Sequence, residues 1–214
     1  MTAARLLVWR HGRTAWNHEQ RMQGQLDVPL DDVGVAQAEK AAAVLGVYRP
    51  VRLVASDLSR AARTAQALAD RTGLEIEFDQ DLREVDTGSW GGMLVSEVRE
   101  RFPELYAPVA RNDPDARRGG DGESLRELAD RAEKALRRAA DGTPDGETAV
   151  VASHGLATKV GVGQLIGLPP ETWGFLGGLE NCAWAELTVG DGRWRLNGWN
   201  LRVGPGLVPS EPTG

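Results

Sequence analysis

Short apolar runs alternate with segments of helical periodicity along most of this chain, and that alternation constrains the fold more than any other feature. The runs at 5–9, 51–55, 75–78 and 148–152 have the length and composition of strands. Helical segments follow them, opened by capping residues and closed by glycine, at 31–46, 56–73, 124–142 and 155–167. Strands that alternate with helices predict the α/β class, here a three-layer α/β/α sandwich with a mostly parallel central sheet.

Capping residues mark where the predicted helices begin. Asp31 or Asp32 can cap the first, and Ser56 or Asp57 the second. Ser124 and Glu127 have the spacing of a capping box, in which each side chain accepts a hydrogen bond from the other residue's backbone, and they predict the start of the third.

Residues 91–120 interrupt the regular pattern. Pro103, Pro108 and Pro114 break any long helix there, because proline lacks the backbone N–H that a helix interior needs. We expect this stretch to be a small inserted lid segment over the strand ends.

The C-terminal part of the chain has a different pattern. Two segments, 183–189 and 193–199, flank Gly190-Asp191-Gly192 and predict a hairpin. The chain of 214 residues suits one domain, which we expect over residues 1–203. Residues 204–214 are expected to be a disordered tail.

Charge and composition limit the partners. The net charge of −6 and the lack of a basic run argue against a nucleic-acid partner. Apolar runs are too short to span a membrane, and the single Cys182 excludes an internal disulfide framework. A cytoplasmic location is therefore the simplest expectation. Cys182 is expected to be a buried apolar residue, and the late cluster of Trp173, Trp184, Trp194 and Trp199 to be core or a homodimer contact.

Two of the three histidines occur in the same context. His11 and His154 each precede a glycine and follow a buried strand. Ligands of open α/β sheets bind at the carboxyl ends of strands, so both imidazoles are expected at one edge. One such histidine alone would be read as a loop residue, as His18 is, but the repeated context favours a shared site.

Arginines accompany these histidines. Arg10 precedes His11, and Arg63 lies in the helix that follows the strand ending near Ser56. A guanidinium presents a planar fork of donors that matches phosphate oxygens, so two Arg and two His around one crevice predict a phosphoryl-binding pocket. The alternative for Arg63 is a solvated charge on the helix surface.

Five sequence blocks resemble the histidine phosphatase superfamily, which includes the cofactor-dependent phosphoglycerate mutases. They are, in order, Arg10-His11-Gly12-x-Thr14-x-x-Asn17, Ser56-Asp57-Leu58-x-Arg60-Ala61-x-Arg63-Thr64-Ala65, Leu82-Arg83-Glu84-x-x-x-Gly88-x-Trp90-x-Gly92, Gly122-Glu123-Ser124 and Ser153-His154-Gly155. A lone Arg-His-Gly is weak evidence, whereas five blocks in order are strong evidence.

The resemblance implies a role for each matching residue. His11 would be the nucleophile that becomes phosphorylated, and Glu84 would protonate the leaving oxygen and later deprotonate water. Arg10, Arg63 and His154 would hold the phosphoryl oxygens. Further contacts to the phosphate or substrate are expected from Asn17, Gln23, Gly24 and Gly155. The Arg and His charges can do what a Mg²⁺ does in other enzymes, and no cluster has metal-ligand spacing, so we expect neither metal nor cofactor.

The phosphatase branch is favoured over the mutase branch. The block around Glu84, with Trp90 and Gly92, resembles that of the phosphatases, and the interval from Glu84 to His154 is shorter than mutases usually have. Segments 21–27, 177–181 and 193–200 resemble actinobacterial glucosyl-3-phosphoglycerate phosphatases. The expected substrate is therefore a small phosphorylated metabolite such as glucosyl-3-phosphoglycerate, and the expected chemistry is metal-independent hydrolysis through phosphohistidine.

Two alternatives remain open, a phosphoglycerate mutase and a non-catalytic family member that binds a phosphorylated ligand. The presence of all the expected catalytic residues favours an enzyme over the second. Residues 93–120 depart from the phosphatase subgroup. In that segment Arg111, Arg117 and Arg118 could meet a substrate carboxylate, although a solvated basic loop is the simpler reading.

Overall fold

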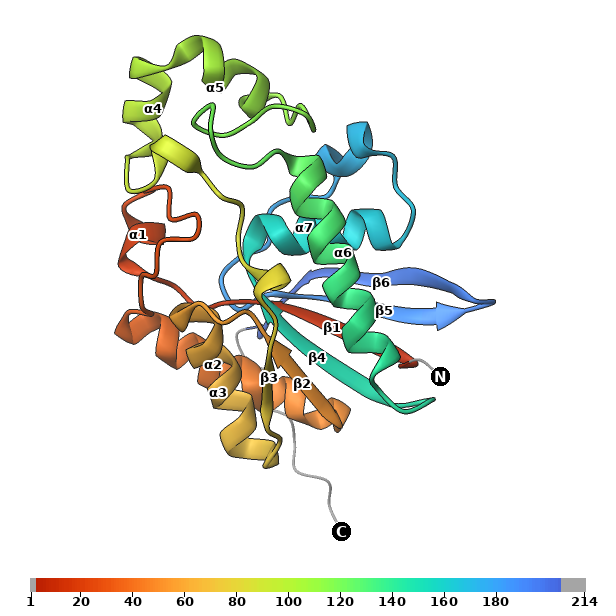
Figure 1. Ribbon diagram of the computed structural model, residues 1–214. Helices are drawn as coiled ribbons and strands as arrows, with labels where there is room; N and C mark the ends of the chain where they lie inside the picture. Colours follow the sequence, from red (N-terminus) through yellow and green to blue (C-terminus); the bar gives the residue numbers. More distant parts are fainter. Residues whose placement is uncertain (1–2, 205–214) are drawn as a thin grey trace.

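The computed structural model describes residues 3–204 and contains a six-stranded sheet between two layers of helices (Figure 1). The strands are β1 (Arg5–Arg10), β2 (Arg52–Ala55), β3 (Ile76–Phe78), β4 (Thr148–Ser153), β5 (Trp184–Gly190) and β6 (Arg193–Leu201). The α-helices are α1 (Ala15–His18), α2 (Asp32–Leu45), α3 (Ser59–Thr72), α4 (Val95–Arg101), α5 (Pro103–Ala110), α6 (Leu125–Asp141) and α7 (Gly155–Leu165). Short 3₁₀ turns occur at Gly46–Tyr48, Gln80–Leu82, Gly88–Trp90 and Pro170–Phe175.

The sheet has the strand order β3-β2-β4-β1-β5-β6. The first four of these strands are parallel, and β5 and β6 form an antiparallel hairpin. Asp191 and Gly192 take positive φ at its turn, which is what a tight hairpin turn requires. The predicted fold class and the predicted hairpin are both confirmed.

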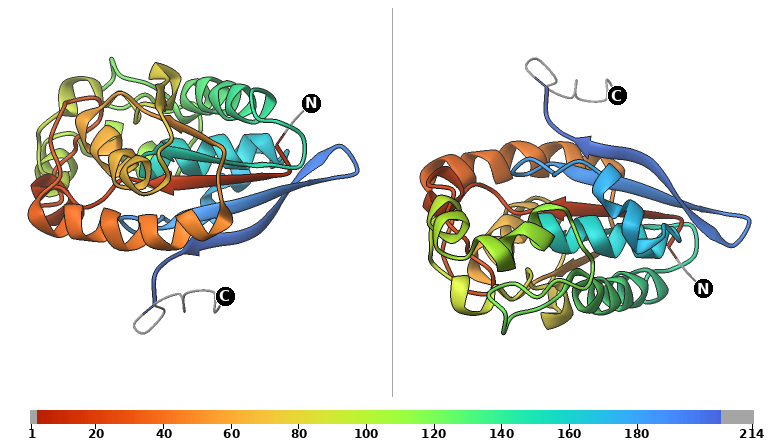
Figure 2. Two further views of the ribbon diagram at one scale, coloured as in Figure 1. Left: turned by 90° about the horizontal axis from the view of Figure 1, so that it is seen from below. Right: turned by 90° about the horizontal axis from the view of Figure 1, so that it is seen from above.

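Each face of the sheet is covered by a different pair of helices. Leu7 and Trp9 of β1 pack with α2 and α3, whereas Leu6 and Val8 pack with α6 and α7. The two views of Figure 2 show these helices on opposite sides of the strands. Alternate residues of a strand point to opposite faces, so a run that is apolar at every position is what a doubly covered strand needs.

Helix boundaries follow the capping signals with one exception. Asp31 caps α2, and the Ser124–Glu127 capping box opens α6, as predicted. The prediction that Ser56 or Asp57 caps α3 is wrong, because the N-cap is Leu58. The Asp27 carboxylate, from a distant loop, accepts the Ser59 N–H instead at 2.8 Å.

Residues 91–120 hold two short helices, α4 and α5, and a loop (Figure 1). Pro103 starts α5, which is the helical position that tolerates a missing N–H. No long helix forms there, as predicted. Figure 1 places this segment beyond the carboxyl ends of the parallel strands. Its role as a lid remains a prediction, and nearly all of the predicted tail, 204–214, lies outside the described residues.

The late tryptophans are divided between core and partial exposure. Trp173 and Trp184 are buried, whereas Trp194 and Trp199 are half-buried against the α6 and α7 side. Cys182 is buried, and burial raises the pKa of its thiol to about 12, as expected of an unreactive cysteine. Within residues 3–204, no helix is long and apolar enough to cross a membrane.

Candidate active site

The register of the two central strands brings His11 and His154 together. β1 pairs with β4 so that Arg10 lies opposite Ser153, and each histidine is the next residue. The two rings lie edge to face with centroids 5.1 Å apart, and both are buried. The sequence-based expectation that both imidazoles share one edge of the sheet is met.

A different arginine from the expected one joins them. Arg60 is fully buried and lines the cavity beside Arg10 and His11, whereas Arg63 lies on the exposed face of α3. The placement of Arg63 in the pocket is therefore corrected to Arg60. The buried stripe of α3 runs through Ala61, Thr64, Ala65 and Leu68, and Arg60 lies at the edge of that stripe while Arg63 lies outside it.

Both arginines are anchored by backbone carbonyls and not by carboxylates. Arg60 donates to the carbonyls of Leu26 at 2.9 Å and Gly24 at 2.7 Å, and Arg10 donates to the carbonyl of Leu179. Within residues 3–204, neither guanidinium has an acidic side chain within ion-pair distance. Their positive charge is therefore free to attract an anion.

The environment keeps both histidines neutral. Burial, and then the charges of Arg10 and Arg60, hold the pKa of His11 well below the usual histidine value. Burial, then Arg60 and the neighbouring His11, lower the pKa of His154 in the same way. His11 Nδ1 lies 2.7 Å from the Gly12 carbonyl, which can only accept, so Nδ1 carries the proton and Nε2 has the free lone pair.

Glycine at position 12 lets helix α2 approach this loop closely. A Cβ on Gly12 would lie 2.4 Å from the Gly34 carbonyl oxygen in the first turn of α2. The Gly12 N–H donates to Thr64 at 3.0 Å, so the segment that carries His11 is tied to both α2 and α3.

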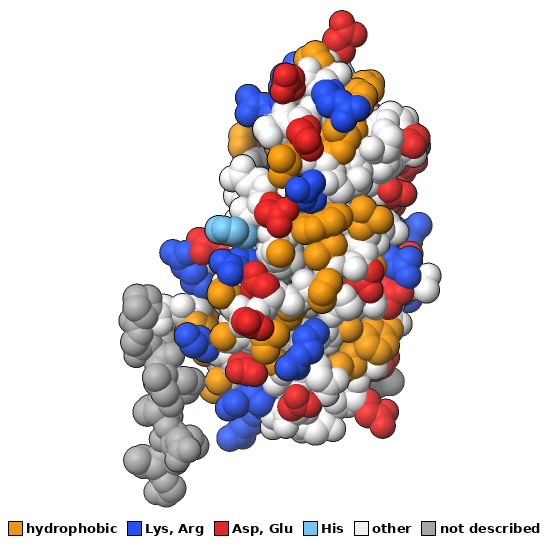
Figure 3. Space-filling view, turned by 90° about the vertical axis from the view of Figure 1, so that its left-hand side faces the viewer, with side chains coloured by type: hydrophobic (Ala, Val, Ile, Leu, Met, Phe, Trp, Pro, Cys, Tyr) orange, Lys and Arg blue, Asp and Glu red, His pale blue; other side chains and the backbone are white. Residues whose placement is uncertain are grey.

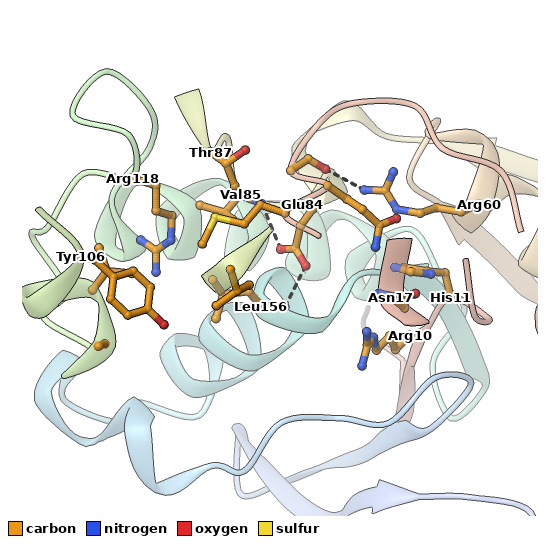
Figure 4. Close-up of a pocket in the computed structure, with 16 residues that line it drawn as sticks. Arg10, His11, Asn17, Arg60, Glu84, Val85, Thr87, Tyr106, Arg118 and Leu156 are labelled. Carbon is orange, nitrogen blue, oxygen red and sulfur yellow. Dashed lines mark hydrogen bonds between the residues drawn. The ribbon is translucent and has the colours of Figure 1, made fainter. Parts of the chain in front are cut away.

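Glu84 lies at the N-terminus of α7. Its carboxylate accepts hydrogen bonds from the backbone N–H groups of Val85 at 2.9 Å and of Leu156 and Ala157 at 3.0 Å. The first turn of a helix has free N–H donors and a positive dipole end, so it fixes a carboxylate well. Figure 4 shows Glu84 in the middle of the cavity, with dashed lines for its hydrogen bonds to Val85 and Leu156.

Arg131 fixes the backbone around Glu84 by hydrogen bonds to three carbonyl groups. Arg131 of α6 donates to the carbonyls of Asp81 at 2.9 Å, Arg83 at 2.6 Å and Glu84 at 2.9 Å. Its other donors form two bonds of 2.7 Å with the Glu123 carboxylate. Glu123 is thus occupied by Arg131, and it is absent from the cavity lining.

Two side-chain amides face the cavity with their oxygens already engaged. Asn17 Oδ1 accepts from the Thr14 N–H at 3.1 Å, and Gln23 Oε1 accepts from the Thr14 hydroxyl at 2.9 Å. Their N–H₂ groups remain as donors at the cavity wall. Gly24 also lines the cavity, at a φ of +52° that disfavours other residues. Gly155 does not line it, but a Cβ there would lie 3.3 Å from Arg10 Nε.

The cavity continues away from the histidines toward α4 and α5. It encloses about 290 Å³, and at this far end it is lined by Val95, Tyr106, Val109, Ala110 and Arg118. Figure 4 shows Tyr106 and Arg118 on one side of Glu84, with Arg10, His11 and Arg60 on the other. Arg118 is buried, so the simpler sequence reading of a solvated arginine is wrong, whereas Arg111 and Arg117 are exposed as that reading expected.

One face of the molecule is mixed in charge: on the face seen in Figure 3, acidic and basic side chains are interspersed and do not gather by sign. Within residues 3–204, no three His, Cys, Asp or Glu side chains come close enough together to hold a metal ion.

A doubly covered α/β sheet with a buried His pair and two arginines at its carboxyl edge defines a class of phosphoryl-binding protein. The sequence matches the profile of the histidine phosphatase superfamily, branch 1, over residues 6–202. The chain belongs to this superfamily, and the family and enzyme class predicted from the sequence are confirmed.

Relatives and solved structures agree with this assignment. The chain is 38% identical to glucosyl-3-phosphoglycerate phosphatase of Mycolicibacterium vanbaalenii, over 94% of this chain and 96% of that protein. The structure of a mycobacterial glucosyl-3-phosphoglycerate phosphatase with VO3 superposes with a TM-score of 0.86 and 37% identity, over 92% of this chain and 98% of the other. A "probable phosphoglycerate mutase" of Salmonella paratyphi C is 34% identical, over 89% and 87%.

Proposed function

We propose that this chain hydrolyses a small phosphomonoester through a phosphohistidine intermediate on His11, without a metal or another cofactor. Glucosyl-3-phosphoglycerate is the first ester to test, because relatives named glucosyl-3-phosphoglycerate phosphatase match nearly the whole chain. The fold and the neutral, oriented His11 support the chemistry.

Unpartnered donors around the histidine pair carry the proposal. Arg10 Nε, Arg60 Nε and His154 Nδ1 are buried without a hydrogen-bond partner. A buried donor without a partner costs about 1–3 kcal/mol, so such groups persist mainly where function needs them. A bound phosphoryl group would provide acceptor oxygens for these donors, and VO3, which a solved relative binds, is an oxyanion of related shape.

The first step transfers the phosphoryl group to His11. The Nε2 lone pair attacks phosphorus, and the bond from phosphorus to the ester oxygen breaks as the N–P bond forms. The positive charges of Arg10 and Arg60 stabilise the phosphoryl oxygens during the transfer. The departing alkoxide takes a proton from the Glu84 carboxyl, which lies in the same cavity.

The second step returns the enzyme to its starting state. Water attacks the phosphorus of phosphohistidine, the N–P bond breaks, and Glu84 accepts the proton that water loses. Inorganic phosphate leaves and His11 is neutral again. In a mutase, by contrast, a second hydroxyl of the substrate would take the phosphoryl group, so access of water decides between the two reactions.

Ser56 gives His154 a hydrogen-bond partner at Nε2. Its hydroxyl lies 2.9 Å from His154 Nε2, and it can donate to that nitrogen. His154 would then carry its proton on Nδ1, the nitrogen that has no partner in the protein. A neutral His154 in this tautomer donates a hydrogen bond to the phosphoryl group without adding a buried charge.

Phosphate release tests the proposal. Purified protein in EDTA is offered glucosyl-3-phosphoglycerate and 3-phosphoglycerate, and free phosphate and isomerised ester are measured. We expect phosphate from at least one ester at an unchanged rate with EDTA, and none from the His11→Ala protein. A rate that needs Mg²⁺ would overturn the metal-free chemistry, and isomerisation without phosphate release would favour the mutase.

A further inference from the structure

A side chain from the turn before β5 reaches the phosphoryl end of the cavity from outside. Asn181 Nδ2 donates to the Asn17 side-chain oxygen at 3.1 Å and to the His11 backbone carbonyl at 3.2 Å. Asn17 lines the cavity on the same side of Glu84 as His11 (Figure 4), whereas Asn181 does not line it. Asn181 therefore contacts two residues of the proposed phosphoryl site without facing the substrate.

The Asn181 side chain is presented by a tight turn. The Ala183 N–H donates to the Glu180 carbonyl at 3.1 Å, and Cys182 takes a φ of +58° inside this turn. That backbone conformation is unfavourable for a residue with a Cβ, so the surrounding contacts must hold it. One of them is the bond of 2.8 Å from the Glu180 N–H to the Asn200 side-chain oxygen, which ties the turn to β6. The backbone that carries Asn181 is therefore fixed.

The Asn181 donation decides how the neighbouring amides share hydrogens. The Asn17 side-chain oxygen has two lone pairs, which the Thr14 N–H at 3.1 Å and Asn181 Nδ2 fill. The Thr14 hydroxyl has one hydrogen, and it lies 3.2 Å from the Asn17 oxygen and 2.9 Å from the Gln23 oxygen. Because the Asn17 oxygen is already filled, that hydrogen goes to Gln23. Both amides then keep their oxygens engaged within the protein and their N–H₂ groups as donors at the cavity wall.

We propose that Asn181 is a positioning residue of the phosphoryl site, which holds the Asn17 and Gln23 amides with their N–H₂ groups toward the phosphoryl oxygens. Donors that are oriented before the substrate arrives need no reorganisation during the transfer, so they stabilise the developing charge better than mobile donors do. Without Asn181, the Thr14 hydroxyl hydrogen would be shared between two oxygens, and the Asn17 amide would be free to turn its oxygen toward the anion. This inference rests on the proposed function and adds a residue to its machinery.

A double-mutant cycle between Asn181 and Asn17 tests this dependence. Leucine is close to asparagine in size but has no donor, so Asn181→Leu removes the contact and keeps the volume. We expect Asn17→Ala to lower kcat/KM by about 10- to 100-fold and Asn181→Leu by about 5- to 10-fold. In the Asn17→Ala protein, the further change Asn181→Leu should cost less than about twofold, because the amide on which Asn181 acts is gone.

Asn197→Leu is the matched control. Asn197 is exposed on β6, where its amide donates to the Thr188 hydroxyl at 2.8 Å, so its replacement should leave kcat/KM unchanged. Losses that multiply in the Asn17→Ala, Asn181→Leu protein would show that Asn181 acts independently of Asn17, and they would overturn the proposal. An Asn181→Leu protein as active as the wild type, or no more impaired than Asn197→Leu, would overturn it equally. Should Asn181→Leu fail to fold, the smaller change Asn181→Ala takes its place.

The side-chain amide signals of Asn17 give a readout that a merely structural role would not change. In the ¹H–¹⁵N spectrum of the labelled protein, they are the pair that disappears in Asn17→Ala. We expect saturating inorganic phosphate to shift this pair in the wild-type protein and to shift it far less in Asn181→Leu. Equal shifts in the two proteins, or no shift of this pair in wild-type protein that binds phosphate, would reject the positioning role.

Phosphate binding also separates this inference from the proposed hydrolysis. A wild-type protein that shows the Asn181-dependent shift but hydrolyses no ester would overturn the hydrolysis alone. A wild-type protein that hydrolyses esters, with a shift that does not depend on Asn181, would overturn the positioning role alone. Failure of the wild-type protein to bind phosphate at all would overturn both.

Discussion

Two arginines of α3, three residues apart, have opposite environments. Arg60 is buried in the cavity wall and Arg63 is exposed. Replacing Arg60 with methionine should lower kcat/KM by about 10²–10³-fold, since it removes a donor from the phosphoryl site. Arg63→Met should stay within about twofold, because an exposed substitution rarely changes more. Steady-state rates of both variants check this, and a large loss in Arg63→Met would return that residue to the site.

Glu84 is expected to matter most for poor leaving groups. An alkyl alkoxide needs a proton as it leaves, whereas p-nitrophenolate does not, so Glu84→Gln should slow transfer from an alkyl ester by about 10²–10⁴-fold and from p-nitrophenyl phosphate far less. Single-turnover kinetics are needed, because hydrolysis of phosphohistidine also uses Glu84. Equal losses for both esters would remove Glu84 from the role of acid. Glu123, the next carboxylate in the sequence blocks, is engaged by Arg131 and is a poor substitute.

At the scale of elements, helix α6 positions Glu84 through the hydrogen bonds of Arg131. Arg131 does not contact the substrate in this account and acts on the reaction only by holding Glu84 in place. Arg131→Lys keeps the charge but cannot bond three carbonyls and a carboxylate at once. We expect it to lower kcat for alkyl esters about tenfold, in proportion to the misplacement of Glu84, with little change in KM. The solvent-exposed Arg137→Lys in the same helix is the control. A loss confined to KM, or equal in both variants, would contradict the positioning role.

The sequence predicted the elements more securely than the details of their ends. Continuous apolar runs identified the central strands because both faces of the sheet are covered, and capping residues located α2 and α6. The start of α3 was misplaced because two good capping residues serve other partners, Ser56 the His154 ring and Asp57 the Arg83 guanidinium. Such long-range contacts leave no local signal.

Site residues were predictable where a local sequence motif places them, and not where tertiary packing decides their position. The two His-Gly pairs that follow strands were enough to predict that His11 and His154 lie together, because the parallel register of β1 and β4 places the ends of these strands side by side. The choice of Arg60 over Arg63 could have been made from the apolar stripe through Ala61, Ala65 and Leu68, because Arg60 lies beside that stripe. Arg118 could not be placed, because an irregular loop buries it.

For the whole molecule, the buried histidines predict how stability depends on pH. Their pKa values are lowered in the folded state, so below about pH 6.5 the unfolded chain binds protons that the native protein does not. Their contribution is fully present above that pH and is lost as pH falls. Each histidine should lower the free energy of unfolding by about 1.4 kcal/mol per pH unit well below 6.5.

Urea unfolding between pH 5 and 7.5 measures this slope. Within that range Asp57, whose pKa Arg83 holds below its ordinary value, does not titrate in either state. His154→Gln should remove about half of the histidine contribution to the slope, whatever it does to stability at pH 7.5. If the free energy of unfolding of the wild-type protein does not decrease as the pH is lowered below 6.5, the two buried rings are protonated in the folded protein.

The central claim is that His11 carries the phosphoryl group between substrate and water. A rapid-quench experiment with a radiolabelled phosphate ester tests it most directly, with the protein recovered under alkaline conditions that preserve phosphohistidine. We predict an acid-labile label that maps to the peptide containing His11, forms no more slowly than phosphate is released, and is missing in the His11→Ala protein. Phosphate release by wild-type protein with no labelled intermediate, or a label on any other residue, would contradict the mechanism.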